Sequence, residues 1–157
     1  MIFLIYVLLS PQEPIHVSLG DPVLSLNLTN WDGETTKADH VLNTGFIIFL
    51  STGCGACWED LPRIEEKIGL HYEALFLFLN EEKNNISEIK RMLPDRLGQV
   101  YFVDQEPMLE LNIKKTPSLL GYEDGFLKIA YHGSLSEKYL SIIISQFKKP
   151  VNLKRER

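Results

Sequence analysis

Cysteine is scarce in this chain: only Cys54 and Cys57 are present, and they stand three positions apart. A disulfide between them would close a very small loop and remove little entropy from the unfolded chain. The pair is therefore a poor structural staple. If the pair is not structural, its role is either reversible thiol chemistry or metal binding.

The chain also lacks the third cysteine that a four-ligand zinc site built on two cysteines would need. Histidine does not replace it, because the four histidines are scattered without ligand spacing: His16, His40, His71 and His132. We therefore expect neither a metal nor another cofactor. The sequence also has no internal repeat and no low-complexity tract.

There is no excess of basic residues, since 16 Lys and Arg stand against 21 Asp and Glu, for a formal net charge of −5. A basic field of the kind that neutralises phosphates is missing, so nucleic acid is not expected as a partner. With 157 residues and 45% hydrophobic content, the chain is long enough for one compact domain.

A long apolar run is missing as well. Residues Ile2–Leu9 form an apolar stretch that stops at Ser10-Pro11, less than half of the ~20 residues needed to cross a bilayer. No Lys or Arg precedes the stretch, and no clear cleavage site follows it. It is either the remnant of a membrane anchor or signal, or an N-terminal segment that lies on the folded body. We divide the chain into a stub and linker (1–19), a domain (20–148) and a polar tail (149–157).

The sequence that is present alternates between strand and helix patterns. Val23–Leu28 alternates apolar and polar residues, as in a half-buried strand. Continuous apolar runs predict buried strands at Phe46–Leu50 and Ala74–Leu79, and Gln99–Val103 is predicted as the next strand. Two further strands, Ser118–Tyr122 and Phe126–Tyr131, are predicted to form a hairpin that turns at Glu123-Asp-Gly125.

The helical spacing of apolar residues predicts one helix that begins at or near Cys54. Three further helices are predicted over Asn85–Leu93, Pro107–Leu111 and Leu135–Phe147. Strands that alternate with helices and end in a hairpin and one helix indicate a mixed sheet with helices on both faces. The expected fold class is a three-layer α/β architecture.

The sequence Cys54-Gly-Ala-Cys57 lies where a buried strand passes into a helix. The positive end of a helix dipole favours the thiolate and can lower a thiol pKa from ~8.5 into a range of roughly 3.5 to 7.5. Cys54 is then the nucleophile, and Cys57 resolves the mixed disulfide. A peroxidatic cysteine is less well supported, because Ile47 and Ser51 stand where that motif has Pro and Thr.

At these residues the sequence resembles the thioredoxin-like thiol-disulfide oxidoreductases of the TlpA/ResA type, and is also similar to the thioredoxin-like maturation protein of methylamine dehydrogenase. The resemblance runs from about Gly20 to Phe147 and rests on the following segments: Gly20-Asp-Pro22 with Asp32-Gly33, Phe49–Cys54, Asp60 and Pro62, Val103-Asp104, Ile113, and Thr116-Pro117.

The resemblance implies a thioredoxin-like fold with an N-terminal hairpin extension. It also implies a cis Thr116–Pro117 bond beside the dithiol, with the Thr116 backbone available to pair with a substrate strand. From the residues alone, Pro117 equally fits an ordinary trans proline that opens a strand. Lys114 and Lys115 either add positive potential near Cys54 or are two solvated loop lysines.

The chain departs from the family pattern at three places. Leu50 and Gly53 replace aromatic residues that commonly precede the motif, so partner preference can differ. Ile48 stands where cytoplasmic thioredoxins bury an aspartate that assists proton transfer from the second cysteine. Asp60 or Glu59 is a candidate for that role, although either also fits a plain acid in the first turn of a helix.

The expected function is a protein dithiol-disulfide oxidoreductase that works as an extracytoplasmic reductase. The partners would be protein thiols and disulfides together with an electron-relay protein. We expect a monomer. The resemblance implies a protein that is anchored in the membrane or secreted on the outer face of the cell membrane, with a cytoplasmic location as the alternative. A second hypothesis is a thioredoxin-like binding module, a chaperone or metal-capturing accessory protein, whose dithiol does not turn over.

Overall fold

The computed structural model describes residues 17–69 and 71–147. The apolar run Ile2–Leu9 and the polar tail 149–157 lie outside the described residues, so the predictions made for them are not tested. The strands are β1 (Asn27–Thr29), β2 (Thr35–Lys37), β3 (Gly45–Phe49), β4 (Glu73–Leu79), β5 (Val100–Val103), β6 (Ser118–Glu123) and β7 (Phe126–His132).

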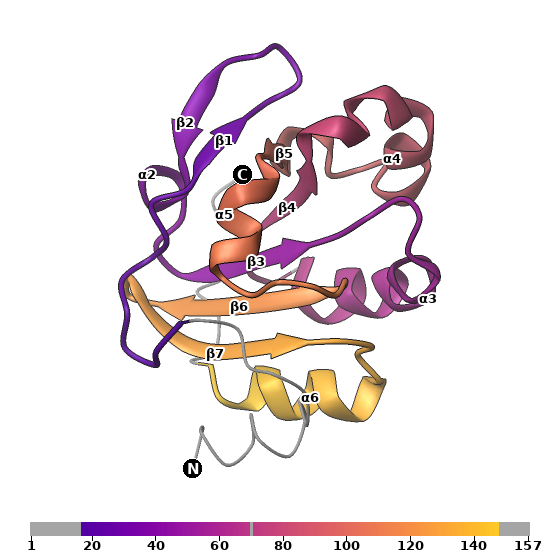
Figure 1. Cartoon of the computed structure of the whole chain (residues 1–157). Coiled ribbons are helices and arrows are strands. Elements are labelled where there is room, and N and C mark those ends of the chain that lie inside the picture. The colour runs from indigo at the N-terminus through magenta and orange to yellow at the C-terminus, as the bar shows by residue number, and fades with distance from the viewer. Residues whose placement is uncertain (1–16, 70, 148–157) are drawn as a thin grey trace.

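The helices are α2 (Ala38–Val41), α3 (Gly55–Ile64), α4 (Ile86–Met92), α5 (Gln105–Glu110) and α6 (Glu137–Ser145). A π-helical turn (Glu65–Gly69) continues α3, and two 3₁₀ helices occupy Asn80–Asn85 and Leu97–Gln99. All strands belong to one seven-stranded sheet in the order β2-β1-β5-β4-β3-β6-β7, as Figure 1 shows.

The sheet is mixed. Strands β3, β4 and β5 run parallel, while β1 is antiparallel to β5, and β6 is antiparallel to both β3 and β7. Strand β3 lies in the interior of the sheet, between β4 and β6, and corresponds to a continuous apolar run of the sequence. Its residues Phe46, Ile47, Ile48 and Phe49 are fully buried. Such a strand needs cover on both faces, because successive side chains point to opposite sides.

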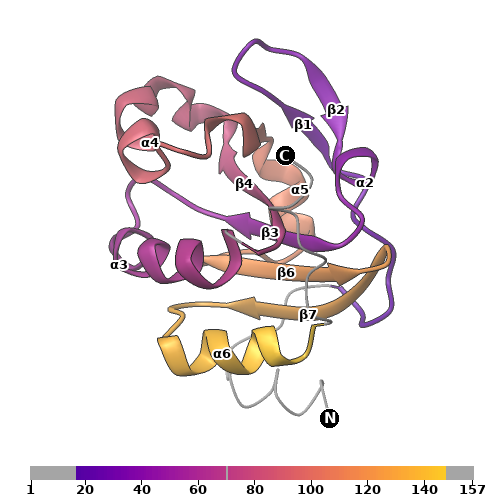
Figure 2. The same ribbon diagram turned by 180° about the vertical axis from the view of Figure 1, so that it is seen from behind.

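The two faces are covered by different helices. Phe46 and Ile48 pack with residues of α3, α4 and α6 in one core cluster, whereas Ile47 and Phe49 pack with residues of α2 and α5 in the other. In Figure 2, α3 and α6 lie in front of the sheet, and α5 lies behind it. The predicted three-layer α/β architecture is confirmed.

The predicted N-terminal hairpin is also confirmed. Strands β1 and β2 pair across a turn in which the Asn30 side chain accepts hydrogen bonds from the backbone of Asp32 and Glu34, both at 2.9 Å. The first strand is shorter than the predicted Val23–Leu28. Val23 is buried, but its N–H bonds to the Gly125 carbonyl, away from the β1 ladder.

Two predicted helices differ from the structure at their first residues. The last helix starts at Glu137, not at Leu135, because the N–H of Leu135 is bonded to the Asp60 carboxylate and Ser136 caps the helix. The short helix begins at Gln105, before Pro107. A proline is tolerated in the first turn, where its missing N–H would have no partner within the helix.

Within residues 17–69 and 71–147, no helix is long and apolar enough to pass through a lipid bilayer. Membrane anchoring therefore stays a prediction about the part of the chain outside these residues.

Candidate active site

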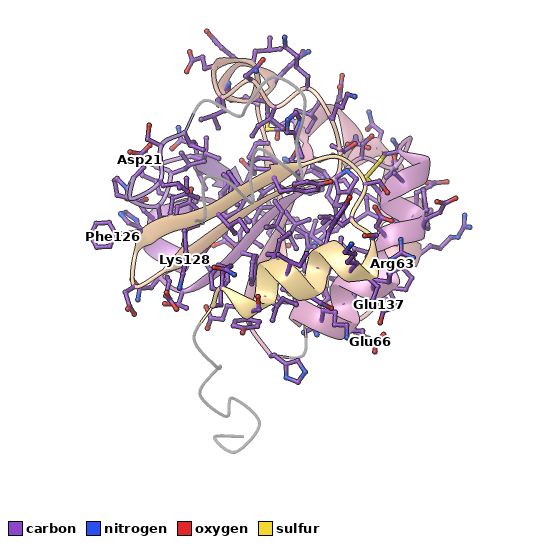
Figure 3. The ribbon with its side chains drawn as sticks, turned by 90° about the horizontal axis from the view of Figure 1, so that it is seen from below. Asp21, Arg63, Glu66, Phe126, Lys128 and Glu137 are labelled. Carbon is purple, nitrogen blue, oxygen red and sulfur yellow. A yellow bond between two sulfur atoms is a disulfide. The ribbon has the colours of Figure 1, made fainter. Side chains whose placement is uncertain are left out.

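Cys54 and Cys57 form a disulfide at the first turn of α3, with their Cα atoms 5.2 Å apart. Figure 3 draws this bond in yellow beside the helix. Cys54 is the N-cap of α3 and partly exposed, and its Sγ accepts a hydrogen bond of 3.1 Å from the N–H of Cys57. Cys57 is fully buried. The exposed sulfur is thus the one at the positive end of the helix dipole.

The Thr116–Pro117 peptide bond is cis, as the resemblance implies. The carbonyl oxygen of Thr116 lies 3.2 Å from the Sγ atom of Cys54. The sheet brings these loops together, because β6 is antiparallel to β3 and its first residue, Ser118, pairs with Phe49 at the end of β3. The predicted residues Cys54, Cys57, Thr116 and Pro117 therefore lie at one place on the molecule.

Asp60 is fully buried one turn beyond Cys57. Its Oδ2 accepts hydrogen bonds from the Leu135 N–H at 2.8 Å and from the Ser134 hydroxyl at 3.1 Å. Its Oδ1 pairs with Arg63, which is labelled in Figure 3 and also reaches the Leu135 carbonyl. These contacts tie α3 to the segment before α6.

The environment of Asp60 includes Tyr131, whose hydroxyl donates to the Ser134 carbonyl at 3.0 Å. Burial raises the pKa of Tyr131, and electrostatic interactions with Tyr139 and Asp60 raise it further. Glu59, the other candidate for proton transfer, is exposed on the solvent side of α3.

Glu82 holds the loop before Cys54 and is not among the site residues predicted from the sequence. Its Oε1 accepts hydrogen bonds from the Thr52 N–H at 2.6 Å, the Thr52 hydroxyl at 2.7 Å and the Ser51 hydroxyl at 3.3 Å. Trp58 adds a further bond, from its indole N–H to the Thr52 carbonyl at 2.9 Å.

One sequence signal could have pointed to Glu82. It follows the buried strand Ala74–Leu79, just as the loop at Ser51 follows the buried strand Phe46–Leu50. The carboxyl ends of parallel neighbouring strands meet at one edge of a sheet. Glu82 was therefore a candidate for contact with the loop that leads into Cys54.

No group of three or more His, Cys, Asp or Glu side chains that could hold a metal ion occurs among the described residues. Lys114 and Lys115 are both exposed, directly before Thr116.

No family model matches the chain, and no curated protein matches it. Several solved structures are similar in shape. A secreted Mycobacterium tuberculosis disulfide oxidoreductase homologous to E. coli DsbE has a TM-score of 0.59 and 10% identity, covering 78% of this chain and 96% of its own.

A thiol:disulfide interchange protein from Bacteroides sp. has a TM-score of 0.61 and 10% identity, covering 83% of this chain and 90% of its own. A thiol:disulfide interchange protein of the thioredoxin family from Chlorobium tepidum has a TM-score of 0.58 and 14% identity, covering 82% and 99%. This chain has a thioredoxin-like fold. The similarity in shape shows the fold alone. At sequence identities this low, the reaction has to be inferred from the residues of the site.

Proposed function

We propose that this protein is a thiol-disulfide oxidoreductase that exchanges disulfides with partner proteins through Cys54 and Cys57. The observation that carries the proposal is the pairing of a partly exposed Cys54 Sγ at the first turn of α3 with a buried Cys57. The backbone N–H of Cys57 that points at Cys54 Sγ would stabilise a thiolate there.

In the reducing direction, the Cys54 thiolate attacks one sulfur of a partner disulfide. The partner S–S bond breaks, a mixed disulfide forms, and the departing thiolate takes a proton from solvent. Cys57 then loses its proton and attacks Cys54, which releases the second partner sulfur as a thiol. Two electrons pass to the partner, which gains two protons, and Cys54 and Cys57 are left as a disulfide.

Thr116 and Pro117 would position the partner. The Thr116 carbonyl lies 3.2 Å from Cys54 Sγ, so backbone pairing with an extended partner segment at Thr116 would bring the partner cysteine to Cys54. Proton transfer from Cys57 by Asp60 or Glu59 remains a hypothesis. The contacts described for Asp60, to Arg63, Ser134 and Leu135, serve the packing of α3.

We further propose the reducing direction, a TlpA/ResA-type role outside the cytoplasm, and an electron-relay protein that regenerates the dithiol. The support is the sequence resemblance together with the secreted Mycobacterium tuberculosis oxidoreductase among the proteins of similar shape.

The test is trapping of the mixed disulfide. The reduced protein is mixed with a peptide disulfide, quenched with acid and weighed by intact mass spectrometry. We expect the wild type to become oxidised without an adduct. Cys57→Ser should accumulate one peptide on Cys54, and Cys54→Ser should form no adduct.

The double variant Cys54→Ser/Cys57→Ser measures the background. Full disulfide reduction by Cys54→Ser would contradict the proposal. Partner binding that is unaffected by loss of both cysteines, with no turnover in the wild type, would instead support the binding-module hypothesis.

A further inference from the structure

A cavity of about 410 Å³ adjoins the contact between Cys54 and Thr116. Thr116 lines it, and the carbonyl of the same residue is the one that lies 3.2 Å from Cys54 Sγ. Ser51, from the loop that leads into Cys54, lines it as well. The cavity therefore lies next to Thr116, the residue with which a partner segment would pair to bring its cysteine to Cys54.

Most of the cavity wall is apolar. The carboxyl-terminal ends of β3 and β4 contribute one side, and α5 with the turn after it contributes the other: Leu50, Leu77 and Leu79, then Met108, Leu109 and Ile113. Leu109 is 60% exposed at the rim of the cavity. An apolar side chain that entered the cavity would be removed from water together with this surface.

The remaining wall is polar, and three of its residues carry charge: Glu82, Lys114 and Lys115. Lys114 and Lys115 are both exposed, although the chain as a whole carries a formal charge of −5. The carboxylate of Glu82 also lines the cavity, but it is buried and its Oε1 already accepts bonds from Ser51 and Thr52. The exposed part of the wall thus combines the apolar Leu109 and the neutral Gln105 with the positive charge of Lys114 and Lys115.

We propose that this surface, Leu109 with Lys114 and Lys115, selects partners whose reactive cysteine is flanked by a large apolar side chain and an acidic side chain. The apolar side chain enters the cavity, and the acidic one pairs with the lysines at its rim. The inference rests on the proposed function, because the cavity matters only if a partner cysteine is brought to Cys54.

Peptide disulfides test the preference. Each is a pentapeptide whose central cysteine is capped by neutral mercaptoethanol and flanked by Leu and Asp in either order. The second-order rate of reduction by the reduced full chain is measured. Replacing Leu by Ala should slow reduction roughly tenfold, because a buried aliphatic contact is lost. Replacing Asp by Lys should slow it about threefold or more, an effect that about 0.5 M salt should largely screen.

Matched variants assign the preference to this surface. Lys115→Glu should remove the difference between the Asp and Lys peptides, because the two positive charges become one positive and one negative, whereas Lys138→Glu, an equal charge change at an exposed position on α6, should keep the difference. Leu109→Ser should remove most of the difference between the Leu and Ala peptides. Circular dichroism shows that each variant is folded.

The small, neutral hydroxyethyl disulfide distinguishes a failure of the inferred peptide preference from a failure of the proposed function. If the wild type reduces it but reduces all peptides at one rate, the inference is overturned and the proposed function stands. A preference that Lys115→Glu and Leu109→Ser leave unchanged also overturns the assignment. If neither the small disulfide nor any peptide is reduced, both the inference and the proposed function are overturned.

Discussion

Replacing Asp60 with Asn separates the two roles that this residue can have. The substitution keeps the shape of the side chain and removes its charge. One carboxylate oxygen becomes an NH₂ group, which cannot accept from Leu135 and Ser134 on one side or from Arg63 on the other. Whichever way the amide is oriented, a donor faces a donor.

The expected cost follows from these contacts. A hydrogen bond to a charged group contributes about 1.5–3 kcal/mol, and the bond from the buried Leu135 N–H belongs in that range. The Arg63 side chain is 40% exposed, so solvent reduces its contribution to about 0–1 kcal/mol. We expect Asp60→Asn to lower the free energy of unfolding by about 2 kcal/mol, or Tm by about 4–8 °C.

Urea denaturation followed by circular dichroism measures this loss. Glu59→Gln is the matched control, since Glu59 is exposed on the same helix and its change should stay within about 0.5 kcal/mol. An Asp60→Asn protein as stable as the wild type would refute the packing role. A slower exchange rate per folded molecule, with a shifted pH profile, would support proton transfer by Asp60.

Two further substitutions test the loop before Cys54 and the core. Glu82→Ala should lower the free energy of unfolding by about 2 kcal/mol and speed deuterium uptake at the Thr52 amide, because that N–H loses its 2.6 Å acceptor; unchanged uptake would contradict this. Gly121→Ala should cost about 1–3 kcal/mol, since its Cβ would lie 2.4 Å from Phe147 Cζ. Gly98→Ala is the control, because a Cβ atom at Gly98 would have no neighbouring heavy atom within 4 Å. Equal stabilities of the two variants would show that the side chains around Gly121 rearrange to accommodate the added methyl group.

The fold was predictable where a pattern is local. The continuous apolar run Phe46–Leu50 predicted a strand buried on both faces, and β3 occupies Gly45–Phe49 between β4 and β6, with every residue buried. The passage from that strand into a helix predicted a helix that begins at or near Cys54, and Cys54 is the N-cap of α3. Both inferences depend on residues that are neighbours in sequence.

The parts that were missed depend on contacts between distant residues. Glu82 holds Thr52 across 30 positions. Its place after a buried strand indicates the edge of the sheet at which it lies, but not Thr52 as its partner. Asp60 binds the N–H of Leu135, 75 positions away, and no local pattern indicates this contact. Strand β2 has only three polar residues and forms because β1 lies beside it.

The central claim is that Cys54 and Cys57 form a reversible redox pair, and the equilibrium reduction potential tests it most directly. The protein is incubated in dithiothreitol or glutathione buffers of graded potential, and the oxidised fraction is measured after thiol labelling. The account predicts full cycling between dithiol and disulfide, with a midpoint near or below the ~−270 mV of thioredoxin. A midpoint near the ~−120 mV of DsbA would reverse the proposed direction. A pair that does not cycle would contradict the claim itself.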